Sequence, residues 1–443
     1  MQHVALEQRV GVAGAGHAAH DAARGVKRPW QLVAHPARGD TCHRRGREFL
    51  SNAPHGLVVT AHTATSAAGR GRQALHAALR ERRSGLRHND FGAEGRLDCF
   101  IGRVDGVEDS PLPAELAGWE CRNNRLAWLG LQSDGFLDDA RAVIARHGTA
   151  RVAIVIGTST SSIGESEDAY ANLEDGHFAQ RHARPLVHTP HSLGSFLQAA
   201  TGAEGPCVTV ATACSSSAKV FAQAERLIRA GFADAAIVGG VDTLCGSVLY
   251  GFNSLGLVSN RPCRPFDVDR NGLSLGEAAG FALLEREGDG PRLLGWGESS
   301  DAHHMSSPHP EGLGARLAMQ GALARANLEP GDIDYINLHG TATPKNDEIE
   351  AGAIARLFPD TTLASSTKGW TGHTLGAAGI LESVIALLVL EHGDVPGVLN
   401  SERLDPLCGP QVHLDNQRRE CRYVMNNSFG FGGNNCSLLF ARA

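Results

Sequence analysis

The chain has 443 residues, enough for two domains or for one large α/β unit built from two halves. Hydrophobic residues make up 42% and charged residues 20%, which excludes disorder over most of the length. The 41 basic and 48 acidic side chains give a net charge of −7, which excludes a nucleic-acid binder that relies on bulk positive charge.

Cysteine spacing and hydropathy limit the class of protein further. The ten cysteines include no C-x-x-C pair, so neither a zinc ribbon nor a thioredoxin-type motif is indicated. The longest nearly apolar run, 375–390, contains Glu382 and is too short to span a bilayer. The N-terminus lacks the apolar core of a signal peptide. We therefore expect a soluble cytoplasmic protein with reduced thiols and no membrane span.

Residues 1–55 differ from the rest of the chain. They contain eight basic and four acidic residues, six histidines and little hydrophobic periodicity. We interpret them as a poorly ordered extension, with a basic tail as the alternative. The order of predicted elements before and after about residue 290 is similar, which suggests two stacked halves.

From residue 56 onward the pattern alternates between buried strands and helices. Strands that are apolar on both faces predict largely parallel sheets covered on two sides. The predicted strands are 56–60, 152–156, 207–211, 235–238, 335–338, 363–365, 423–425 and 437–440, and the main helices are 69–86, 216–230, 312–326, 347–357 and 375–390.

The strongest local feature is the sequence Thr-Ala-Cys-Ser-Ser-Ser around Cys214. A buried strand ends here in a turn of small residues, and a helix begins just after the cysteine. This is the strand–turn–helix arrangement of a nucleophile elbow, although the G-x-S-x-G letters are absent. The helix start favours the thiolate, so we expect a lowered thiol pKa. A core cysteine capped by serines is the alternative.

Two histidines favour the catalytic interpretation of Cys214. His339 opens the sequence His-Gly-Thr-Ala-Thr-Pro after a predicted strand, and His373 follows Lys-Gly-Trp-Thr-Gly before a predicted helix. Ligands bind to α/β sheets at the carboxyl ends of strands, so both histidines are placed for catalysis rather than for a structural role. No further ligand lies at typical spacing, so no metal site is predicted.

A lysine and a glutamate form a second layer of candidates. Glu382 is the only charge within the apolar run 375–390 and should be buried with a partner. Lys368 precedes that helix by one short loop and is the natural partner. A structural salt bridge and a role in tuning the histidines are equally compatible with this pattern.

Residues 426–435 read Asn-Asn-Ser-Phe-Gly-Phe-Gly-Gly-Asn-Asn between two predicted strands. We interpret them as a loop whose glycines let the backbone swing or point N–H groups at an oxyanion while an aromatic ring closes a channel. A plain hairpin turn is the alternative, which the length of the glycine run disfavours.

The turn at Cys214, the loop that begins at His339, the segment that contains Lys368 and His373, and residues 426–435 together resemble segments of the elongating β-ketoacyl-[acyl-carrier-protein] synthases. They occur in the family's order, and the resemblance covers about residues 56–443. The resemblance implies an α/β fold of the thiolase type, in which two similar halves form a five-layered αβαβα core. It assigns the nucleophile to a half at 56–292 and the two histidines to a half at 293–443.

The same resemblance implies roles for individual residues. Cys214 resembles the nucleophile that accepts the acyl chain, and His339 and His373 match the pair that serves malonyl decarboxylation. Lys368 matches the lysine that orders this network, and Glu382 matches its acidic companion.

Four more residues match positions around the substrate. Phe431 resembles the gating phenylalanine, beside Gly430, and its N–H would form the oxyanion hole with that of Cys214. Thr341 and Thr343 match hydroxyls that contact the phosphopantetheine arm, and 301–306 resembles a second mobile loop.

The implied reaction is a decarboxylative Claisen condensation in fatty-acid elongation. The partners would be acyl- and malonyl-loaded acyl carrier protein, with no metal and no cofactor beyond the carrier's phosphopantetheine, in a homodimer. A specialised aryl-polyene or polyketide pathway, and a heterodimer, are the alternatives. A non-catalytic chain-length subunit, a CoA-dependent thiolase and an initiating synthase are all disfavoured by the Cys-His-His set. The segment 255–256 lacks the basic residue that many relatives use for carrier docking.

Overall fold

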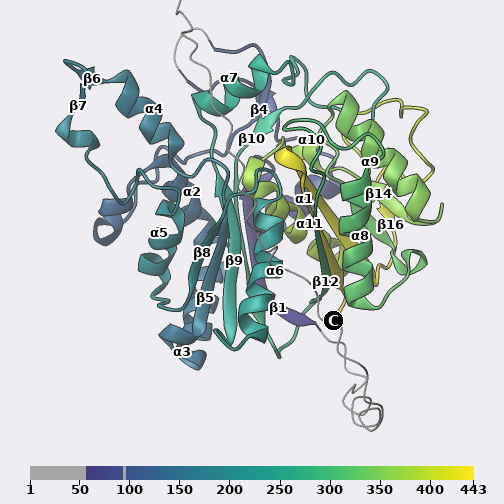
Figure 1. Cartoon of the computed structure of the whole chain (residues 1–443), viewed down its shortest axis with the longest axis horizontal. Coiled ribbons are helices and arrows are strands. Elements are labelled where there is room, and N and C mark those ends of the chain that lie inside the picture. Colours follow the sequence, from purple (N-terminus) through teal and green to yellow (C-terminus); the bar gives the residue numbers. More distant parts are fainter. Residues whose placement is uncertain (1–55, 93–95) are drawn as a thin grey trace, which may run out of the picture. The chain divides into compact units, whose positions relative to one another are not determined.

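The computed structural model describes residues 56–92 and 96–443. The expectation of a poorly ordered extension over 1–55 lies outside the described residues. In the described part, a long twisted sheet runs through the middle and helices cover both of its faces (Figure 1).

Eleven strands of the described chain form one hydrogen-bonded sheet. Its order is β14-β13-β17-β18-β12-β1-β11-β9-β5-β8, with β2 paired to the end of β1. The strands fall into two groups, one of β8, β5, β9, β11 and β1 and one of β12, β18, β17, β13 and β14. The two groups meet where β1 pairs with β12. The strands are β1 (Leu57–Ser66), β2 (Gly69–Arg70), β5 (Val152–Gly157), β8 (Cys207–Val210), β9 (Ala235–Asp242), β11 (Ala278–Glu285), β12 (Arg292–Ser300), β13 (Tyr335–Asn337), β14 (Leu363–Ser365), β17 (Tyr423–Gly430) and β18 (Asn434–Ala441).

The sheet is mixed in direction. Strand β5 is parallel to β8 and β9, and β13 is parallel to β14 and β17. Every pairing from β9 through β11, β1, β12 and β18 to β17 is antiparallel. The prediction of largely parallel sheets is therefore wrong for the centre. The central strands are apolar on both faces because helices cover both faces, and such a pattern carries no information about strand direction.

The helices form three layers. One outer layer, α2, α3 and α5, packs on strands of the first half, and the other, α8 with α9, lies on the second half (Figure 1). Between the halves, α6 and α11 contact strands of both, which gives the five-layered thiolase-like arrangement. The helices are α1 (Gly71–Arg80), α2 (Arg122–Leu131), α3 (Phe136–His147), α4 (Ile163–Ala171), α5 (Ser192–Thr201), α6 (Ser216–Arg229), α7 (Gly246–Ser254), α8 (Leu313–Ala326), α9 (Pro344–Leu357), α10 (Lys368–Thr371) and α11 (Ala378–His392).

The central helices approach each other closely because small residues line their contact. A Cβ atom at Gly379 of α11 would lie 2.3 Å from the main-chain nitrogen of Ala218 in α6. The segment Leu375–His392 is apolar enough by composition to cross a membrane, but 89% of it is buried inside the protein. Burial on all sides explains why the sequence of α11 shows no polar face.

Short elements complete the described chain. Small sheets pair β3 (Arg87–His88) and β10 (Leu275–Gly276) with β4 (Phe100–Gly102), β6 (Leu173–Glu174) with β7 (His177–Phe178), and β15 (Asp394–Val395) with β16 (Gln417–Arg418). The 3₁₀ turns are η1 (Ala114–Trp119), η2 (Ser133–Gly135), η3 (Thr149–Arg151), η4 (Gln180–His182), η5 (Pro330–Asp332), η6 (Leu375–Ala377) and η7 (Phe431–Gly433).

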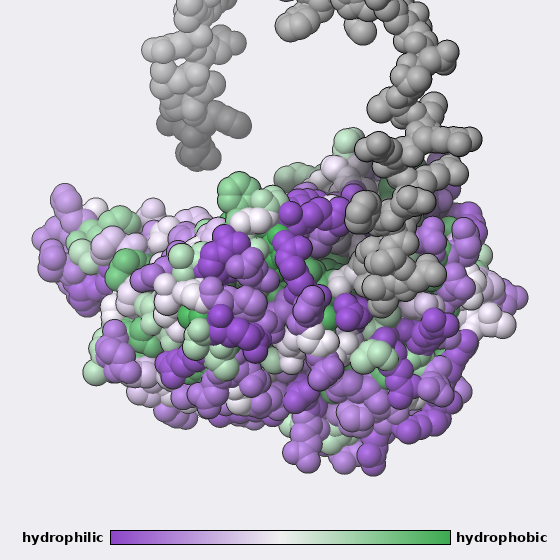
Figure 2. All heavy atoms as spheres, turned by 90° about the horizontal axis from the view of Figure 1, so that it is seen from below, coloured by the Kyte–Doolittle hydropathy of each residue, from purple (hydrophilic) through white to green (hydrophobic). Residues whose placement is uncertain are grey.

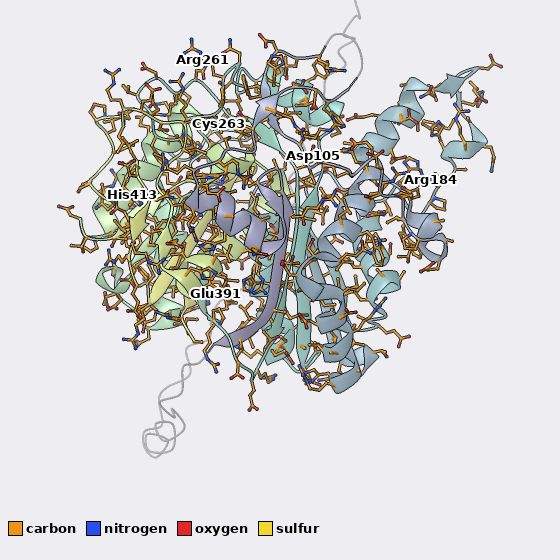
Figure 3. All side chains as sticks on the ribbon, turned by 180° about the vertical axis from the view of Figure 1, so that it is seen from behind. Asp105, Arg184, Arg261, Cys263, Glu391 and His413 are labelled. Atoms are coloured by element: carbon orange, nitrogen blue, oxygen red, sulfur yellow. The ribbon has the colours of Figure 1, made fainter. Side chains whose placement is uncertain are left out.

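Two further views show the outer surface of the described chain and the back of the sheet (Figure 2 and Figure 3). The face in Figure 2 is mainly hydrophilic, with hydrophobic residues in separate patches. Seen from behind, α1 lies over β1, and Glu391 marks the end of α11 (Figure 3). The predicted helix 69–86 is shorter than expected, because residues 69–70 form β2 and α1 covers only Gly71–Arg80.

Candidate active site

The candidate nucleophile lies on a sharp turn between β8 and α6. Cys214 is buried, and the preceding Ala213 has a φ of 51°, a left-handed conformation that a residue with a Cβ seldom adopts. The Ser216 hydroxyl braces the turn, since it accepts from the N–H of Thr212 at 2.9 Å and donates to the Ala213 carbonyl at 2.6 Å. The run of small residues is therefore what lets the chain reverse and present the sulfur at the helix start.

The structure brings both candidate histidines to this cysteine. His339 follows β13 and His373 follows α10, so the three side chains come from three separate loops. The Nε2 atom of His373 lies 3.0 Å from the sulfur of Cys214. One nitrogen of each ring and the sulfur all lie within 4.8 Å of one another. The two rings are nearly perpendicular, with centroids 5.3 Å apart. A single small substrate group can therefore touch all three.

Lys368 and Glu382 lie directly behind the histidines. The ammonium of Lys368 is 2.5 Å from the Glu382 carboxylate and donates to the His339 carbonyl at 2.5 Å. It is also 3.5 Å from His339 Nδ1. Because an ammonium group can only donate, this Nδ1 must be the acceptor and the ring carries its proton on Nε2. Lys368 therefore fixes the tautomer of His339, one nitrogen of which lies within 4.8 Å of the Cys214 sulfur.

Burial controls the charge state of the three catalytic candidates. It raises the pKa of the Cys214 thiol to about 11, although the Lys368 cation and the N–H groups of Phe431 and Cys214 act in the opposite direction. The expectation of a lowered thiol pKa is therefore wrong. Burial, reinforced by the Lys368 cation, holds the pKa values of His339 and His373 well below their usual range. The resting site thus contains a thiol and two neutral imidazoles.

Burial also acts on the acid behind the histidines. It raises the pKa of Glu382 to about 6, while the Lys368 cation opposes this rise. The sequence pattern had placed a buried, partnered charge at this position, and the structure shows that arrangement at 3% exposure.

A second buried carboxylate, Asp242 at the end of β9, anchors the loop that carries His373. Its oxygens accept from the N–H of Gly376 at 2.6 Å, from the N–H of Ser159 at 2.8 Å, and from both the N–H and the hydroxyl of Thr160. A Cβ at Gly376 would lie 2.6 Å from the carboxylate, so only glycine lets the loop approach so closely. Asp242 thereby ties the His373 loop to the end of β5.

The main chain of His373 is held on both sides by the segment 274–277. Its N–H donates to the Ser274 carbonyl at 2.7 Å, and its carbonyl accepts from the N–H of Gly276 at 3.0 Å. The next residue, Glu277, is fully buried and pairs with Arg122 at 2.6 Å.

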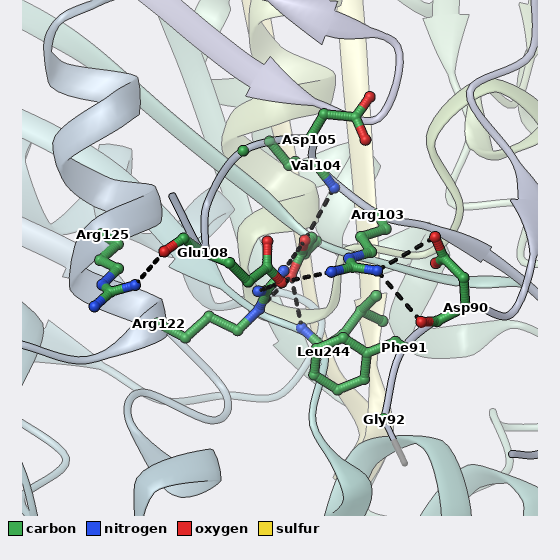
Figure 4. Close-up of polar contacts among 12 residues, drawn as sticks. Asp90, Phe91, Gly92, Arg103, Val104, Asp105, Glu108, Arg122, Arg125 and Leu244 are labelled. Carbon is green, nitrogen blue, oxygen red and sulfur yellow. Dashed lines mark hydrogen bonds and ion pairs between the residues drawn. The ribbon is translucent and has the colours of Figure 1, made fainter. Parts of the chain in front are cut away.

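The Glu277 carboxylate also accepts two main-chain N–H bonds, from Val104 at 2.9 Å and from Leu244 at 3.0 Å. Figure 4 shows these groups and Arg122 converging on one point, with Arg103 and Glu108 beside them. The charged cluster therefore fixes the strand segment that brackets His373.

The loop after β13 is held by carboxylates from α9. Glu350 accepts from the N–H of His339 at 2.8 Å and of Gly340 at 2.7 Å, and burial raises the pKa of this carboxyl to about 7. The hydroxyls of Thr341 and Thr343 lie 2.8 Å apart at the wall of the cavity above the cysteine. The structure thus places both threonines in the lining of the cavity that contains Cys214.

The candidate gate is a tight hairpin, so the predicted ten-residue loop at 426–435 is wrong. Residues up to Gly430 belong to β17, β18 begins at Asn434, and only Phe431–Gly433 connects them. The alternating Asn, Ser and Phe side chains continue the sheet, and Gly432 and Gly433 take the left-handed conformation that the turn requires.

The hairpin turn is attached to both the cysteine and the segment 301–306. The N–H of Phe431 faces the sulfur of Cys214 and acts to lower its pKa, and the Phe431 ring stacks on Phe252 with centroids 5.6 Å apart. On the other side, the N–H of Gly432 donates to the Met305 carbonyl at 2.7 Å. A movement of the turn would therefore change both the donors at the sulfur and the ring over the cavity.

The cavity above the cysteine has a volume of about 340 Å³ and a mixed lining. Phenylalanine and leucine side chains form one part of the wall, and polar side chains, among them Asp301, Ser306 and Asn346, form another, with the two threonines on the side of α9. Its lining includes Cys214, His339, His373, Thr341, Thr343, Phe252, Leu255, Leu257, Leu273, Phe429 and Phe431.

Several supporting residues were not predicted. Asp242, Glu277 and Glu350 are all buried charges next to a catalytic loop. The signal that found Glu382, a lone charge in an apolar run, is also present at Asp242 and Glu277, which adjoin the apolar segments of β9 and β11. Phe252 lies on α7, for which no helix was predicted.

Comparisons with known proteins agree with this geometry. The model of the beta-ketoacyl synthase N-terminal domain matches residues 122–290, and that of the C-terminal domain matches residues 292–402. The 3-oxoacyl-[acyl-carrier-protein] synthase 2 of Mycobacterium bovis is 31% identical over 419 residues, which cover 87% of this chain and 97% of that protein. The mitochondrial 3-oxoacyl-[acyl-carrier-protein] synthase of Arabidopsis thaliana is 39% identical over 263 residues, 54% of this chain and 57% of that protein.

Solved structures give the same result. In the structure of the ketosynthase ApeO in complex with its chain length factor ApeC from Xenorhabdus doucetiae, one chain aligns with a TM-score of 0.80 and 38% identity, over 88% of this chain and 98% of that chain. The fold and the relatives therefore define a thiolase-like condensing acyltransferase. The chain belongs to the β-ketoacyl synthase family, whose members named above are 3-oxoacyl-[acyl-carrier-protein] synthases.

Proposed function

We propose that this chain lengthens an acyl chain by one decarboxylative condensation, with Cys214 as nucleophile and His339 and His373 as the decarboxylating pair. The observation that carries the proposal is the meeting of one thiol and two neutral imidazoles within 4.8 Å at the floor of a largely apolar cavity. Such a site suits a reaction in which negative charge develops on a substrate oxygen.

In the first step the acyl group moves from its carrier to Cys214. Because the thiol is neutral at rest, we infer that His373 Nε2, at 3.0 Å, takes the thiol proton as the sulfur attacks the thioester carbonyl. The N–H groups of Cys214 and Phe431 then hold the oxyanion. When the intermediate collapses, the carrier's sulfur leaves and receives the proton from His373.

In the second step malonyl thioester binds where the first carrier arm lay. Its carboxylate leaves as CO₂, and the electron pair passes to the α-carbon and the thioester oxygen. The Nε2–H of His339, fixed by Lys368, donates to that oxygen, with His373 beside it. The α-carbon attacks the acyl-cysteine carbonyl, the carbon–sulfur bond to Cys214 breaks, and a β-ketoacyl carrier protein forms. The Cys214 thiolate that leaves then takes up one proton from solvent. Water is kept away by the apolar wall.

The partner in both steps is an acyl carrier protein, loaded first with acyl and then with malonyl groups. We infer that its phosphopantetheine arm passes Thr341 and Thr343, whose hydroxyls line the entrance. Lys345, largely exposed at the same mouth and 3.1 Å from Glu348, would have to exchange that partner for an acidic group of the carrier, whereas the nearby Leu255 is apolar. No metal or redox cofactor takes part in these steps, and we propose a cytoplasmic homodimer.

Fatty-acid elongation is the main setting of the proposal. A second setting, a specialised polyene or polyketide pathway with a heterodimeric partner, is favoured by the 38% identity to a chain of the ketosynthase–chain length factor complex. The two settings share the chemistry of the site and differ in the acyl chain and the partner subunit.

Separate assays of the two half-reactions test the proposal. The full chain is incubated with acyl carrier protein bearing a labelled acyl group and with malonyl carrier protein. Wild type should carry the label on Cys214, release CO₂ and form a β-ketoacyl product, and His339→Ala should keep the label but release little CO₂. A Cys263→Ala variant, which removes another buried cysteine, should behave as wild type. Labelling of Cys214 without CO₂ release would show that the chain is a transacylase only.

A further inference from the structure

The cysteine and the two histidines have the chemistry of a metal site as well as of a catalytic one. Their sulfur and nitrogen ligand atoms all lie within 4.8 Å of one another, and no other described group of three His, Cys, Asp or Glu side chains meets that distance. In a tetrahedral zinc site the metal lies about 2.3 Å from sulfur and about 2.1 Å from nitrogen, so the ligand atoms are about 3.5 Å apart. Shifts of about 1 Å would therefore complete the site.

We propose that Cys214, His339 and His373 bind one thiophilic divalent cation such as Zn²⁺, which blocks the condensing reaction until the cation is removed. The metal displaces the thiol proton, so that a sulfur–zinc bond forms as one proton is released. The ring proton of His339 moves from Nε2 to Nδ1, which frees the Nε2 lone pair, and the Lys368 ammonium gives up its contact with Nδ1 while it keeps those with Glu382 and the His339 carbonyl. The fourth position faces the cavity and would hold water, as in sites with three protein ligands. Thiolate and imidazole ligands favour such cations over Mg²⁺.

His373 needs little change to act as a ligand. Its Nε2 already points at the sulfur from 3.0 Å. Its Nδ1 is buried and has no hydrogen-bond partner among the described residues, so no contact fixes the ring proton on one nitrogen. The ring can carry its proton on Nδ1 and offer the Nε2 lone pair to a metal.

Lys368 opposes metal binding at His339. Its ammonium, 3.5 Å from Nδ1, fixes the proton on Nε2, and metal coordination requires a lone pair at that atom. The same positive charge repels a cation. Lys368 therefore favours a donor, which decarboxylation needs, over a ligand, which a metal needs. Removal of the lysine charge should tighten metal binding even though it damages catalysis.

The test uses Co²⁺ as a spectroscopic probe of the reduced, full-length protein in the absence of substrates. Wild type should bind one more equivalent than Cys214→Ala and show thiolate-to-cobalt charge-transfer absorption, which that variant lacks. Cys263→Ala is the matched control, because this thiol (Figure 3) is also buried and donates to the Lys368 carbonyl at 3.2 Å but is not one of the three proposed ligands. It should keep the band. Prior acylation of Cys214 should also abolish the band. Equal stoichiometry and spectra for wild type and Cys214→Ala would overturn the proposal.

Affinity and inhibition measurements complete the test. His373→Ala should weaken Zn²⁺ binding at least about 100-fold. Removal of a group that only hydrogen-bonds to a metal ligand already weakens metal binding by about 10–100-fold. Lys368→Met should bind Zn²⁺ about 10-fold more tightly than wild type. This substitution leaves the buried Glu382 without its partner, so the measurement is repeated with the double variant Lys368→Met/Glu382→Leu. Weaker binding by both would refute the role given to Lys368. Zn²⁺ but not Mg²⁺ should inhibit wild type, and EDTA should restore activity. Because binding is measured without turnover, its failure is distinct from a failure of the condensing reaction.

Discussion

Replacement of Asp242 by Asn should disable the site without touching a catalytic side chain. With the amide oxygen facing Thr160, the NH₂ group would lie where the carboxylate now accepts from the N–H of Gly376 at 2.6 Å. That N–H and the new amide would both be buried and unsatisfied, at about 1–3 kcal/mol each. If the amide is turned the other way, its NH₂ group faces the N–H and the hydroxyl of Thr160, and both of these hydrogen bonds are lost. We therefore expect a loss of about 2–6 kcal/mol, unless the His373 loop moves to relieve it.

Movement of that loop is the catalytic consequence. Gly376 lies three residues after His373, and a displacement of about 1 Å can cost about 100-fold in rate. The assay measures kcat per active site, with active sites counted by the labelled acyl group that Cys214 retains. We expect kcat per site to fall 10–100-fold, while the KM for malonyl carrier protein changes little, because the cavity wall is intact.

Asp334→Asn is the matched control. Asp334 accepts two main-chain N–H bonds, from Arg422 at 2.7 Å and Tyr423 at 3.1 Å, where Asp242 accepts three, and it pairs with Arg419 at 3.2 Å. Within the described chain, none of these contacts reaches a loop that carries Cys214, His339 or His373. The variant should lose stability and keep its kcat per active site. If Asp242→Asn behaved in the same way, the carboxylate would be a stabilising contact only, and the argument that it positions His373 would be refuted.

Three further predictions concern charge and space. Alkylation of Cys214 by iodoacetamide should accelerate with pH to well above 9, in line with a pKa near 11, whereas an inflection near 8.5 would contradict the burial argument. Burial and the Arg72 cation lower the pKa of His62, whose Nε2 lies 3.3 Å from Glu391, to about 3. The neutral ring therefore stabilises the fold above pH 6.5, and this contribution is lost as pH falls toward 3. His62→Gln should reduce the slope of unfolding free energy between pH 6.5 and 4.5 by up to about 1.4 kcal/mol per pH unit; an unchanged slope would contradict this. Gly430→Ala would place a Cβ 3.2 Å from the Cys214 nitrogen, so acylation should slow about 10–100-fold, and normal acylation would argue against the oxyanion hole.

The sequence indicated which residues meet at the candidate site because each of them has a characteristic local sequence. Cys214 follows an apolar strand and precedes a helix, and His339 follows a strand in a loop of glycine and threonine. Glu382 is a charge surrounded by apolar residues. Each of these patterns depends only on residues close to it in the sequence. The resemblance to a family then related the separate segments to one site.

Strand direction could not be predicted, because it depends on pairing between distant segments. Strands β11 and β12 are joined by a short connection and each pairs antiparallel with β1. The sequence of β11, Ala-Ala-Gly-Phe-Ala-Leu-Leu-Glu, is apolar on both faces and resembles a parallel strand. Only the helices α2 and α11 on its two sides explain that composition.

The gate illustrates a different limit. Glycine and phenylalanine in alternation suggested a long loop, yet Phe429 continues β17 with its ring toward His339 at 6.2 Å. A strand can alternate glycine with a large residue when one face meets a close neighbour. At Gly430 that neighbour is the elbow, 3.0 Å from the added Cβ at the Thr212 carbonyl.

The wrong thiol pKa has the most instructive cause. A helix start lowers the pKa of a nearby thiol through a local field, whereas burial raises it through the whole surrounding structure, and here burial is the larger effect. A neutral site also suits the proposed chemistry. By the time the malonyl carboxylate arrives, Cys214 is acylated and carries no charge, so the carboxylate and the enolate that it leaves meet two neutral imidazoles with the Lys368 cation behind them. Because His373 has given its proton to the departing carrier sulfur, its ring is neutral again at that stage, and the Nε2–H of His339 is available as the donor.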